Sequence, residues 1–195
     1  MSEILNAAIE KVQDAKYAFC RFITANDTGK NGSHQSGFYI PKCAAPLLFE
    51  TECVKGENRD KLVQVKWQND FVTDSRFVYY GQGTRNEYRI TRFGRSFPFF
   101  EDDNVGDLLI IAQQSDTYYY GFVLQTDEDI DDFFSFFNLS SEMTNQLINV
   151  SQEHKQRNKL DLGIKELLSL YEDFPETSLM AQLARKVYNS VYNVT

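Results

Sequence analysis

The chain has 195 residues, a net charge of −8 and 42% hydrophobic residues, enough to bury the core of one large domain, with or without a small appendage. No run approaches the roughly 18 apolar residues that a membrane span needs, and residues 1–13 lack the basic flank and apolar block of a signal peptide. Three cysteines without a C-x-x-C spacing (Cys20, Cys43 and Cys53) and only two histidines argue against a disulfide framework and a zinc site, and favour a reducing cytoplasm.

Short predicted strands separated by turn residues follow an opening helix at 3–12, whose apolar residues share one side. Turn formers gather at 25–29, at 81–83 and at 115–116. We expect a helical segment at 43–49 and strands at 17–23, 38–40, 61–67, 76–80, 87–91, 108–114 and 118–124. This pattern predicts a mainly β fold with flanking helices, a barrel or a sandwich, and not a doubly wound α/β sheet.

The last third of the chain has a different pattern. Acidic residues at 127–129 open a helix that carries Phe133, Phe134, Phe136 and Phe137, which we interpret as core, or alternatively as a docking face for another domain. Residues 152–159 are polar and basic and form the best linker candidate, and helical periods of apolar residues follow at 160–171 and 179–191. We therefore expect a first domain at 1–151 and a linker with a helical segment at 152–195.

Charge is unevenly distributed along the chain. Residues 16–95 hold 13 Lys and Arg against 8 Asp and Glu, a net charge of +5, whereas residues 96–195 carry 6 basic and 17 acidic residues, a net charge of −11. A basic body attached to an acidic remainder is a pointer to contact with nucleic acid, although the chain as a whole is acidic.

A first polar segment, residues 26–35, is too long for a tight hairpin turn and is dense in hydrogen-bonding side chains. Asn and Gln can pair bidentately with adenine, Asp can accept from cytosine, and Lys can meet guanine or phosphate. The alternative is an ordinary solvated loop. The candidate DNA contacts of this segment are Asn26, Asp27, Lys30, Asn31, His34 and Gln35.

A second segment, residues 84–95, places four arginines within eleven residues. In a strand, Arg85, Glu87 and Arg89 would share one face, and Tyr88, Ile90 and Arg92 the other. Several guanidiniums on one face repel one another and need an anionic partner, which duplex phosphate and guanine edges supply. The alternative is a surface ladder of ion pairs with the acidic second half. The candidate contacts here are Arg85, Asn86, Glu87, Tyr88, Arg89, Arg92 and Arg95.

These two segments carry a resemblance to a known family. Ala-Asn-Asp-Thr-Gly at 25–29, the Gly, His-Gln, Gly and Tyr-Ile-Pro positions within 32–41, and Thr-Arg-Asn-Glu-x-Arg-Ile-Thr-Arg-x-Gly-Arg at 84–95 resemble the N-terminal effector domain of EcoRII-like restriction endonucleases. The resemblance covers roughly residues 16–125. It implies a B3-type DNA-binding pseudobarrel, an open β-barrel whose two arms grip the major groove.

Carried over residue by residue, the resemblance implicates His34 and Tyr39 in the first arm. It makes Arg85, Glu87 and Arg89 the strongest readers in the second. The sequence departs from the family pattern at Gly83 and Tyr88, where lysines are expected. Two fewer cations imply fewer phosphate contacts or a different recognition site, so no target sequence is carried over.

Residues 174–185 resemble the helical opening of the EcoRII-type catalytic domain. The chain lacks a Pro-Asp followed by Asp/Glu-x-Lys, the set that holds Mg²⁺ at a phosphodiester. We therefore expect no catalytic residue, metal site or cofactor in this chain, and Mg²⁺ only in a separate catalytic domain. The acidic runs at 101–103 and 127–132 lack the spacing of an EF-hand.

Together these observations predict a sequence-specific reader of double-stranded DNA, the recognition domain of a restriction endonuclease in a prokaryotic cytoplasm. Its partners would be duplex DNA and the catalytic domain of the intact enzyme, with no membrane and no small-molecule ligand. Lys30, Arg92 and Arg95 would meet phosphates. Two alternatives are a stand-alone DNA-binding regulator with the same fold, and a small-molecule-binding or hydrolytic barrel.

Overall fold

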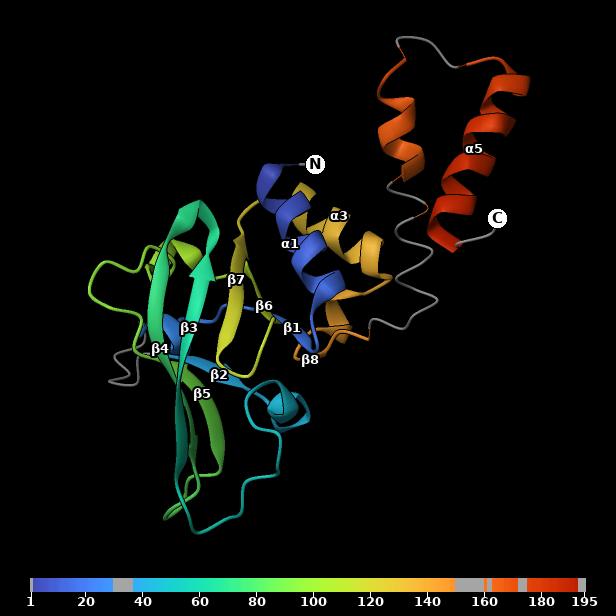
Figure 1. The fold of residues 1–195 in the computed structure, drawn as a ribbon. Coiled ribbons are helices and arrows are strands. Elements are labelled where there is room, and N and C mark those ends of the chain that lie inside the picture. The colour runs from blue at the N-terminus through green and yellow to red at the C-terminus, as the bar shows by residue number, and fades with distance from the viewer. Residues whose placement is uncertain (1, 30–36, 150–159, 161–162, 172–174, 193–195) are drawn as a thin grey trace. The chain divides into compact units, whose positions relative to one another are not determined.

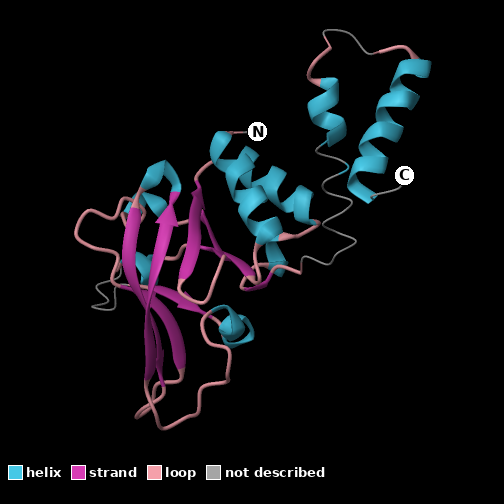
Figure 2. Cartoon of the chain, in the orientation of Figure 1, coloured by secondary structure: helices cyan, strands magenta, loops and turns pink. Residues whose placement is uncertain are grey.

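The computed structural model describes residues 2–29, 37–149, 160, 163–171 and 175–192. The chain divides into two compact units, Met1–Asn149 and Val150–Thr195. Figure 1 shows the elements of each unit, and Figure 2 distinguishes their helices from their strands. None of the helices in the described residues is long and apolar enough to cross a membrane.

The first unit is built on one curled sheet, to which the described residues contribute eight strands in the order β2-β5-β4-β3-β7-β6-β1-β8. Neighbouring strands are antiparallel except β3 and β7, which are parallel. The order ends at β2 on one side and β8 on the other, so the sheet is open. The strands are β1 (Ala18–Phe22), β2 (Phe38–Ile40), β3 (Arg59–Trp67), β4 (Val72–Tyr80), β5 (Glu87–Thr91), β6 (Leu108–Gln113), β7 (Tyr118–Leu124) and β8 (Gln146–Leu147).

Two helices, α1 (Glu3–Asp14) and α3 (Asp127–Phe137), pack against each other and cover one face of the sheet over β6 and β7 (Figure 1). The Ser2 hydroxyl caps α1 by accepting from the Leu5 amide at 3.1 Å, and it donates to Asp129 of α3 at 2.7 Å. Acidic residues fill the first turn of α3, where they stabilise the positive end of the helix dipole. The prediction of a mainly β fold with flanking helices is therefore confirmed.

The opposite face of the sheet holds an aromatic core. Trp67 is 1% exposed, and its ring centroid lies 4.7 Å from that of Phe97 in an edge-on contact. Gly121 on β7 makes this arrangement possible, because a Cβ there would lie 2.5 Å from the Trp67 ring. Aromatic burial of this kind contributes most of the apolar area that stabilises a small β domain.

Several elements differ in detail from the prediction. The segment expected to be helical at 43–49 is a 3₁₀ helix, Lys42–Leu47, because Pro46 has no N–H to donate in an α-helical turn. The turn formers at 25–29 form a short helix, α2 (Ala25–Thr28), which ends at Gly29 with φ +78°. Phe133, Phe134 and Phe137 are buried, as the core interpretation requires. The two-residue strand β8 was not predicted, since so short a strand leaves no periodicity.

Short 3₁₀ turns complete the first unit at Gln68–Asp70, Asp102–Asn104 and Ser141–Met143. In the second unit, residues 163–168 are helical and α5 spans Thr177–Tyr192. Apolar side chains of the two helical segments line one small cavity between them: Ile164, Leu167, Leu168, Met180, Leu183 and Ala184. These are residues of the helical periods that the sequence predicts there.

Candidate nucleic-acid interface

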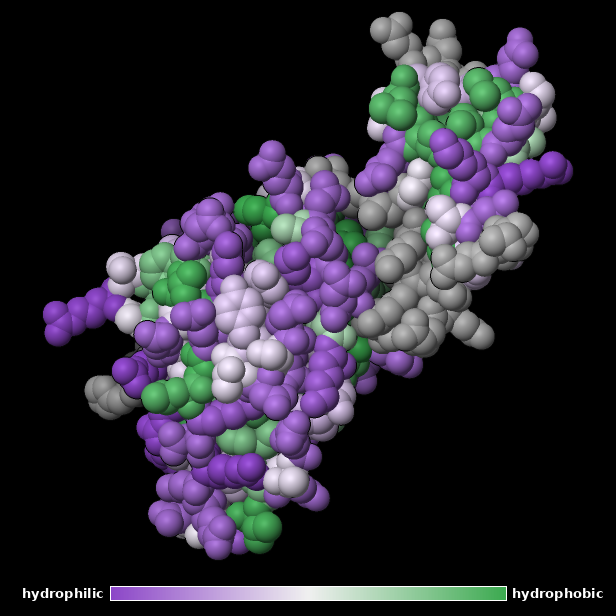
Figure 3. Space-filling model, in the orientation of Figure 1, coloured by the Kyte–Doolittle hydropathy of each residue, from purple (hydrophilic) through white to green (hydrophobic). Residues whose placement is uncertain are grey.

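The part of the sheet formed by β5, β4 and β3 exposes polar and charged side chains on the face opposite the aromatic core. Along β3 and β4 exposed residues alternate with buried ones, so that Leu62 and Val72 are 58% and 47% exposed while Val63 and Phe77 are buried. The face of the first unit that is visible in Figure 3 is mainly hydrophilic, with separate hydrophobic residues on it. A surface of this composition suits a polar partner better than an apolar one.

Strand β5 divides its side chains between the two faces as its period of two requires. Tyr88 and Ile90 belong to the aromatic core, and Glu87 and Arg89 lie on the opposite face. The predicted separation of these four residues is therefore confirmed. Arg85, which we expected on the Glu87 face, lies before the strand begins.

Arg89 is held inside this face rather than presented to solvent. The residue is 4% exposed, it donates to the Gly37 carbonyl at 3.2 Å, and its guanidinium lies 3.4 Å from the Glu87 carboxylate. Among the described residues, its Nε has no hydrogen-bond partner. A buried guanidinium with one distant carboxylate and an unused donor has capacity left for a further acceptor.

The β4–β5 connection, residues 81–86, presents exposed polar side chains at one end of β5. The Arg85 guanidinium lies over the Tyr80 ring, 5.2 Å from its centroid, and Asn86 accepts a hydrogen bond from the Tyr79 hydroxyl at 2.9 Å. The stacking orients Arg85. Because only the Asn86 oxygen is engaged in that bond, the amide nitrogen can still donate.

Two further exposed arginines, Arg92 and Arg95, follow the other end of β5. Arg92 has φ +67°, a left-handed backbone conformation that turns the chain out of the strand. The five residues of β5 span roughly 13 Å at 3.3 Å per residue, and arginines lie just beyond each end of the strand. Positive charge thus flanks the Glu87 face of β5 at both ends.

The charged pair on the neighbouring strands is exposed. Arg76 of β4 donates to Asp60 of β3 at 2.9 Å, and both side chains are more than two-fifths exposed. The Arg76 guanidinium holds the pKa of the Asp60 carboxyl below its usual value. The pair neutralises part of this face and keeps Arg76 on it.

Tyr88, a predicted DNA contact, is a core residue in this structure. It is 3% exposed, and its ring centroid lies 4.7 Å from that of Tyr79 and 6.2 Å from that of Phe49. Burial raises its pKa to about 12. The phenol faces away from Glu87 and Arg89, because alternate residues of a strand point to opposite faces.

Asp27, a predicted DNA contact, is also buried, and its carboxylate is bonded within the protein. The residue is 1% exposed, and its carboxylate forms a bidentate pair with Arg21, at 2.9 Å and 3.1 Å. The same carboxylate accepts from the Thr24 amide and hydroxyl and from the Tyr39 amide. Five donors within the protein thus surround the Asp27 carboxylate.

This ion pair joins the two sides of the open sheet. Arg21 lies on β1, and it donates to the Tyr39 carbonyl of β2 at 2.7 Å, while Asp27 accepts from the Tyr39 amide at 3.0 Å. Two side chains thus satisfy the backbone groups on the outer edge of β2, which has no neighbouring strand there among the described residues. The segment that begins with Asn26, which is exposed, is anchored to the sheet by this contact.

The remaining predicted contacts of the first segment, Lys30, Asn31, His34 and Gln35, lie outside the described residues. Tyr39 is half-buried, on β2 opposite Arg89 of β5. The described part of the chain contains no group of three or more His, Cys, Asp or Glu side chains arranged to hold a metal ion.

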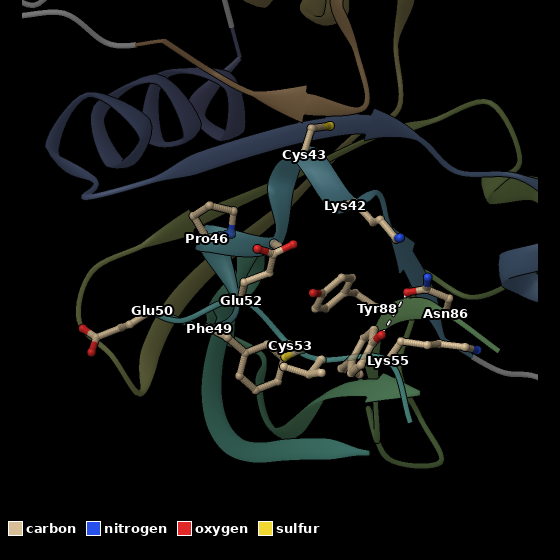
Figure 4. Close-up of a pocket in the computed structure, with 13 residues that line it drawn as sticks. Lys42, Cys43, Pro46, Phe49, Glu50, Glu52, Cys53, Lys55, Asn86 and Tyr88 are labelled. Carbon is tan, nitrogen blue, oxygen red and sulfur yellow. Dashed lines mark hydrogen bonds between the residues drawn. The ribbon is translucent and has the colours of Figure 1, made fainter. Parts of the chain in front are cut away.

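A cavity of about 610 Å³ lies beside the β4–β5 connection (Figure 4). Lys55 and Asn86 line it next to that connection, and Lys42, Phe49 and Cys53 line other parts of its wall. The Lys55 ammonium donates to the Gly83 carbonyl at 2.9 Å and also to the Arg85 carbonyl. Sequence reasoning missed Lys55, because no local pattern relates it to a segment 28 residues away.

Comparison with known proteins identifies the family to which the chain is similar. Residues 12–144 match the family described as restriction endonuclease EcoRII, N-terminal. The type II restriction enzyme EcoRII of Escherichia coli is 30% identical over 123 residues, which make up 60% of this chain and 30% of that protein. The chain thus spans under a third of this relative's length. Among solved structures, the B3 domain of the UbaLAI restriction endonuclease with cognate DNA is similar with a TM-score of 0.42 and 19% identity, covering 69% of this chain and 88% of that one.

Proposed function

Since the chain belongs to the family of EcoRII N-terminal domains, we propose that it is a sequence-specific reader of double-stranded DNA and the effector part of a longer restriction enzyme. One observation carries the proposal. The Glu87 face of β5 is flanked at both ends by exposed arginines, Arg85 on one side and Arg92 and Arg95 on the other. Guanidiniums spaced along a polar surface match the phosphates and guanine edges of a duplex.

The roles divide by exposure. Arg85 and Asn86 are exposed and partly oriented, so they are the groups that meet base edges in the major groove. Arg92 and Arg95 meet phosphates, which fix the register without reading sequence. Glu87 is less exposed and orients the buried Arg89 through their ion pair. Arg89 contacts DNA when its guanidinium donates to a base in place of the Gly37 carbonyl.

Residues 26–35 form the other of the two arms that contact the DNA in this proposal. Asn26 is exposed, and Lys30, Asn31, His34 and Gln35 follow it in the chain. Tyr39 anchors this segment through its backbone. The chain has no catalytic role in this proposal, because DNA hydrolysis with Mg²⁺ belongs to a separate catalytic domain of the intact enzyme, which binding of DNA here would activate.

The test is selection from a randomised duplex pool, followed by a salt titration on the retained sequence. We expect a short enriched motif, and an affinity that falls steeply as salt rises because released counterions drive binding. Binding without enrichment would reduce the function to a backbone clamp. An absence of binding at low salt would contradict the proposal.

A pair of substitutions tests the assignment within the interface. Arg85→Ala is expected to weaken binding to the selected duplex by about 1–3 kcal/mol and to relax the preference at one base pair. Arg185→Ala, which removes an exposed arginine of α5, is the matched control and should leave the preference unchanged. Equal losses on selected and scrambled duplexes for Arg85→Ala would assign this arginine to the backbone instead.

A further inference from the structure

The β4–β5 connection has no regular secondary structure between Tyr80 and Glu87, yet it carries the exposed reading residues. If a loop becomes ordered only when DNA binds, the entropy lost in ordering it reduces the affinity for DNA. A recognition loop is therefore more effective when contacts within the free protein hold it in the bound geometry. The structure supplies such contacts from a neighbouring loop, residues 54–58.

Lys55 is the central contact of this neighbouring loop. Its ammonium donates to the carbonyls of Gly83 and Arg85, on either side of Thr84. An ammonium has three donors, and two of them are directed at the backbone of the connection. The positive charge of Lys55 thus faces carbonyl oxygens of the protein. A lysine beside a DNA-binding loop would by itself suggest a phosphate contact, but these bonds indicate a structural role.

Asn58 and Gly56 hold the beginning of the connection. The Asn58 side-chain oxygen accepts from the amides of Gly81 and Gln82, at 3.0 Å and 3.3 Å, and the Gly56 amide donates to the Gly81 carbonyl at 2.9 Å. The two loops lie so close that a Cβ on Gly81 would be 2.2 Å from the Glu57 carbonyl oxygen. Glycine at position 81 is therefore required by this close approach.

The reading residues emerge from the part of the connection that these bonds hold. The Arg85 backbone is bonded to Lys55 while its guanidinium lies over Tyr80, and the Asn86 side chain is bonded to Tyr79. Figure 4 shows Lys55 and Asn86 side by side at the edge of the cavity. Backbone and side chain of the reading residues are thus both oriented before any DNA arrives.

We propose that Lys55 and Asn58 are positioning residues that determine the sequence preference of the β4–β5 connection without touching DNA. This inference rests on the proposed function, because it specifies how the same interface discriminates between base pairs. A misplaced bidentate contact loses most of its discrimination, whereas phosphate contacts tolerate small shifts. Loss of either positioning residue should therefore weaken selected sites and spare scrambled ones.

The experiment compares Lys55→Met and Asn58→Ala with the unchanged chain, with Lys66→Met as control. Lys66 is a partly exposed lysine at the far end of β3, paired with Asp70. Binding is measured on a selected and a scrambled duplex over a series of salt concentrations. We expect Lys55→Met and Asn58→Ala each to lower affinity for the selected duplex by roughly tenfold, with little change on the scrambled one, since each removes hydrogen bonds that hold the connection. The slope of log affinity against log salt should not change.

A phosphate contact by Lys55 gives a different result. Lys55→Met would then weaken both duplexes equally and would reduce the magnitude of the salt slope by about 0.9, the value for one phosphate. That outcome would overturn the proposal for Lys55. Asn58 carries no charge, so its replacement tests positioning without a change in phosphate attraction. If Asn58→Ala left the sequence preference unchanged, the proposal would be overturned for both residues.

Amide hydrogen exchange on the free chains separates this inference from the proposed function. Exchange at Gln82–Asn86 should accelerate in Lys55→Met and Asn58→Ala and should be unaffected in Lys66→Met. If the unchanged chain does not distinguish selected from scrambled DNA, the proposed function fails, and the recognition role of Lys55 fails with it. If it does distinguish them but exchange and preference are unaltered in both variants, the positioning role alone is wrong.

Discussion

Replacing Asp27 by asparagine should destabilise the first unit more than any exposed change of the same kind. The substitution leaves the side-chain shape but removes the charge that faces Arg21, whose side chain is 6% exposed. Removing one partner of a buried pair costs about 3–5 kcal/mol, because the other charge stays buried without compensation. Whole domains of this size are stable by roughly 5–15 kcal/mol, so the loss is a large fraction of the total.

Urea unfolding followed by tryptophan fluorescence measures this loss. Trp67 is the only tryptophan of the chain and lies in the aromatic core, so its signal reports the sheet and not the second unit. With a urea dependence of about 2 kcal/mol per molar, the midpoint should fall by about 2 M. The control is Asp60→Asn, which breaks an exposed Asp–Arg pair at the same 2.9 Å distance and should cost under about 1 kcal/mol.

The double variant Arg21→Met with Asp27→Leu distinguishes this pair from an ordinary buried ion pair. Apolar replacement of both partners often restores stability. Here it should not, because the amide and carbonyl of Tyr39 lose their partners on the outer edge of β2. A double variant as stable as the unchanged chain, or a loss under about 1 kcal/mol in Asp27→Asn, would refute the assigned role of this pair at the edge of β2.

Three further predictions concern packing and burial. Gly121→Ala should lower stability by about 1–3 kcal/mol in urea unfolding, because the added methyl group meets the Trp67 ring, and an unchanged midpoint would contradict this contact. A thiol reagent at pH 8 should modify exposed Cys43 quickly and leave Cys20 unmodified in the folded chain, since burial raises the Cys20 pKa to about 12; equal labelling rates would contradict this. Burial also raises the pKa of Tyr88 from 10.0 to about 12, so the folded chain retains a proton that the unfolded chain loses. Unfolding free energy should therefore fall by up to about 1.4 kcal/mol per pH unit between pH 10 and about 12, and the fall should be shallower in Tyr88→Phe.

Elements whose side chains follow a local period can be identified from the sequence. The alternation along β5 places Tyr88 and Ile90 on one face and Glu87 and Arg89 on the other. Strand β6 is buried along its whole length, and its sequence shows this as a short apolar run bounded by turn residues. The family resemblance at residues 84–95 depends on consecutive residues as well, so the order of amino acids is enough to detect it. Mainly β architecture with flanking helices could be predicted for the same reason.

Tertiary contacts determine which of the candidate residues are presented to a partner. Asp27 and Tyr88 have the chemistry of DNA contacts in the sequence, but contacts with distant residues bury them. The Asp27 carboxylate is bonded to the Arg21 guanidinium and the Tyr39 amide, and the Tyr88 ring packs against Phe49. No local pattern encodes these contacts, because each depends on how separate elements of the chain pack together in the folded unit.

The amino-acid sequence is thus sufficient to predict the type of fold, the two segments rich in polar and basic residues, and the family to which they belong. The folded chain adds the parallel pairing of β3 with β7, the ion pair of Arg21 and Asp27 that bonds the edge of β2, and the contact of Lys55 with the β4–β5 connection. The physical reason is the range of the interactions. Side-chain periodicity and turn chemistry act over a few residues, whereas burial and hydrogen bonding between strands are settled only when the whole sheet has formed.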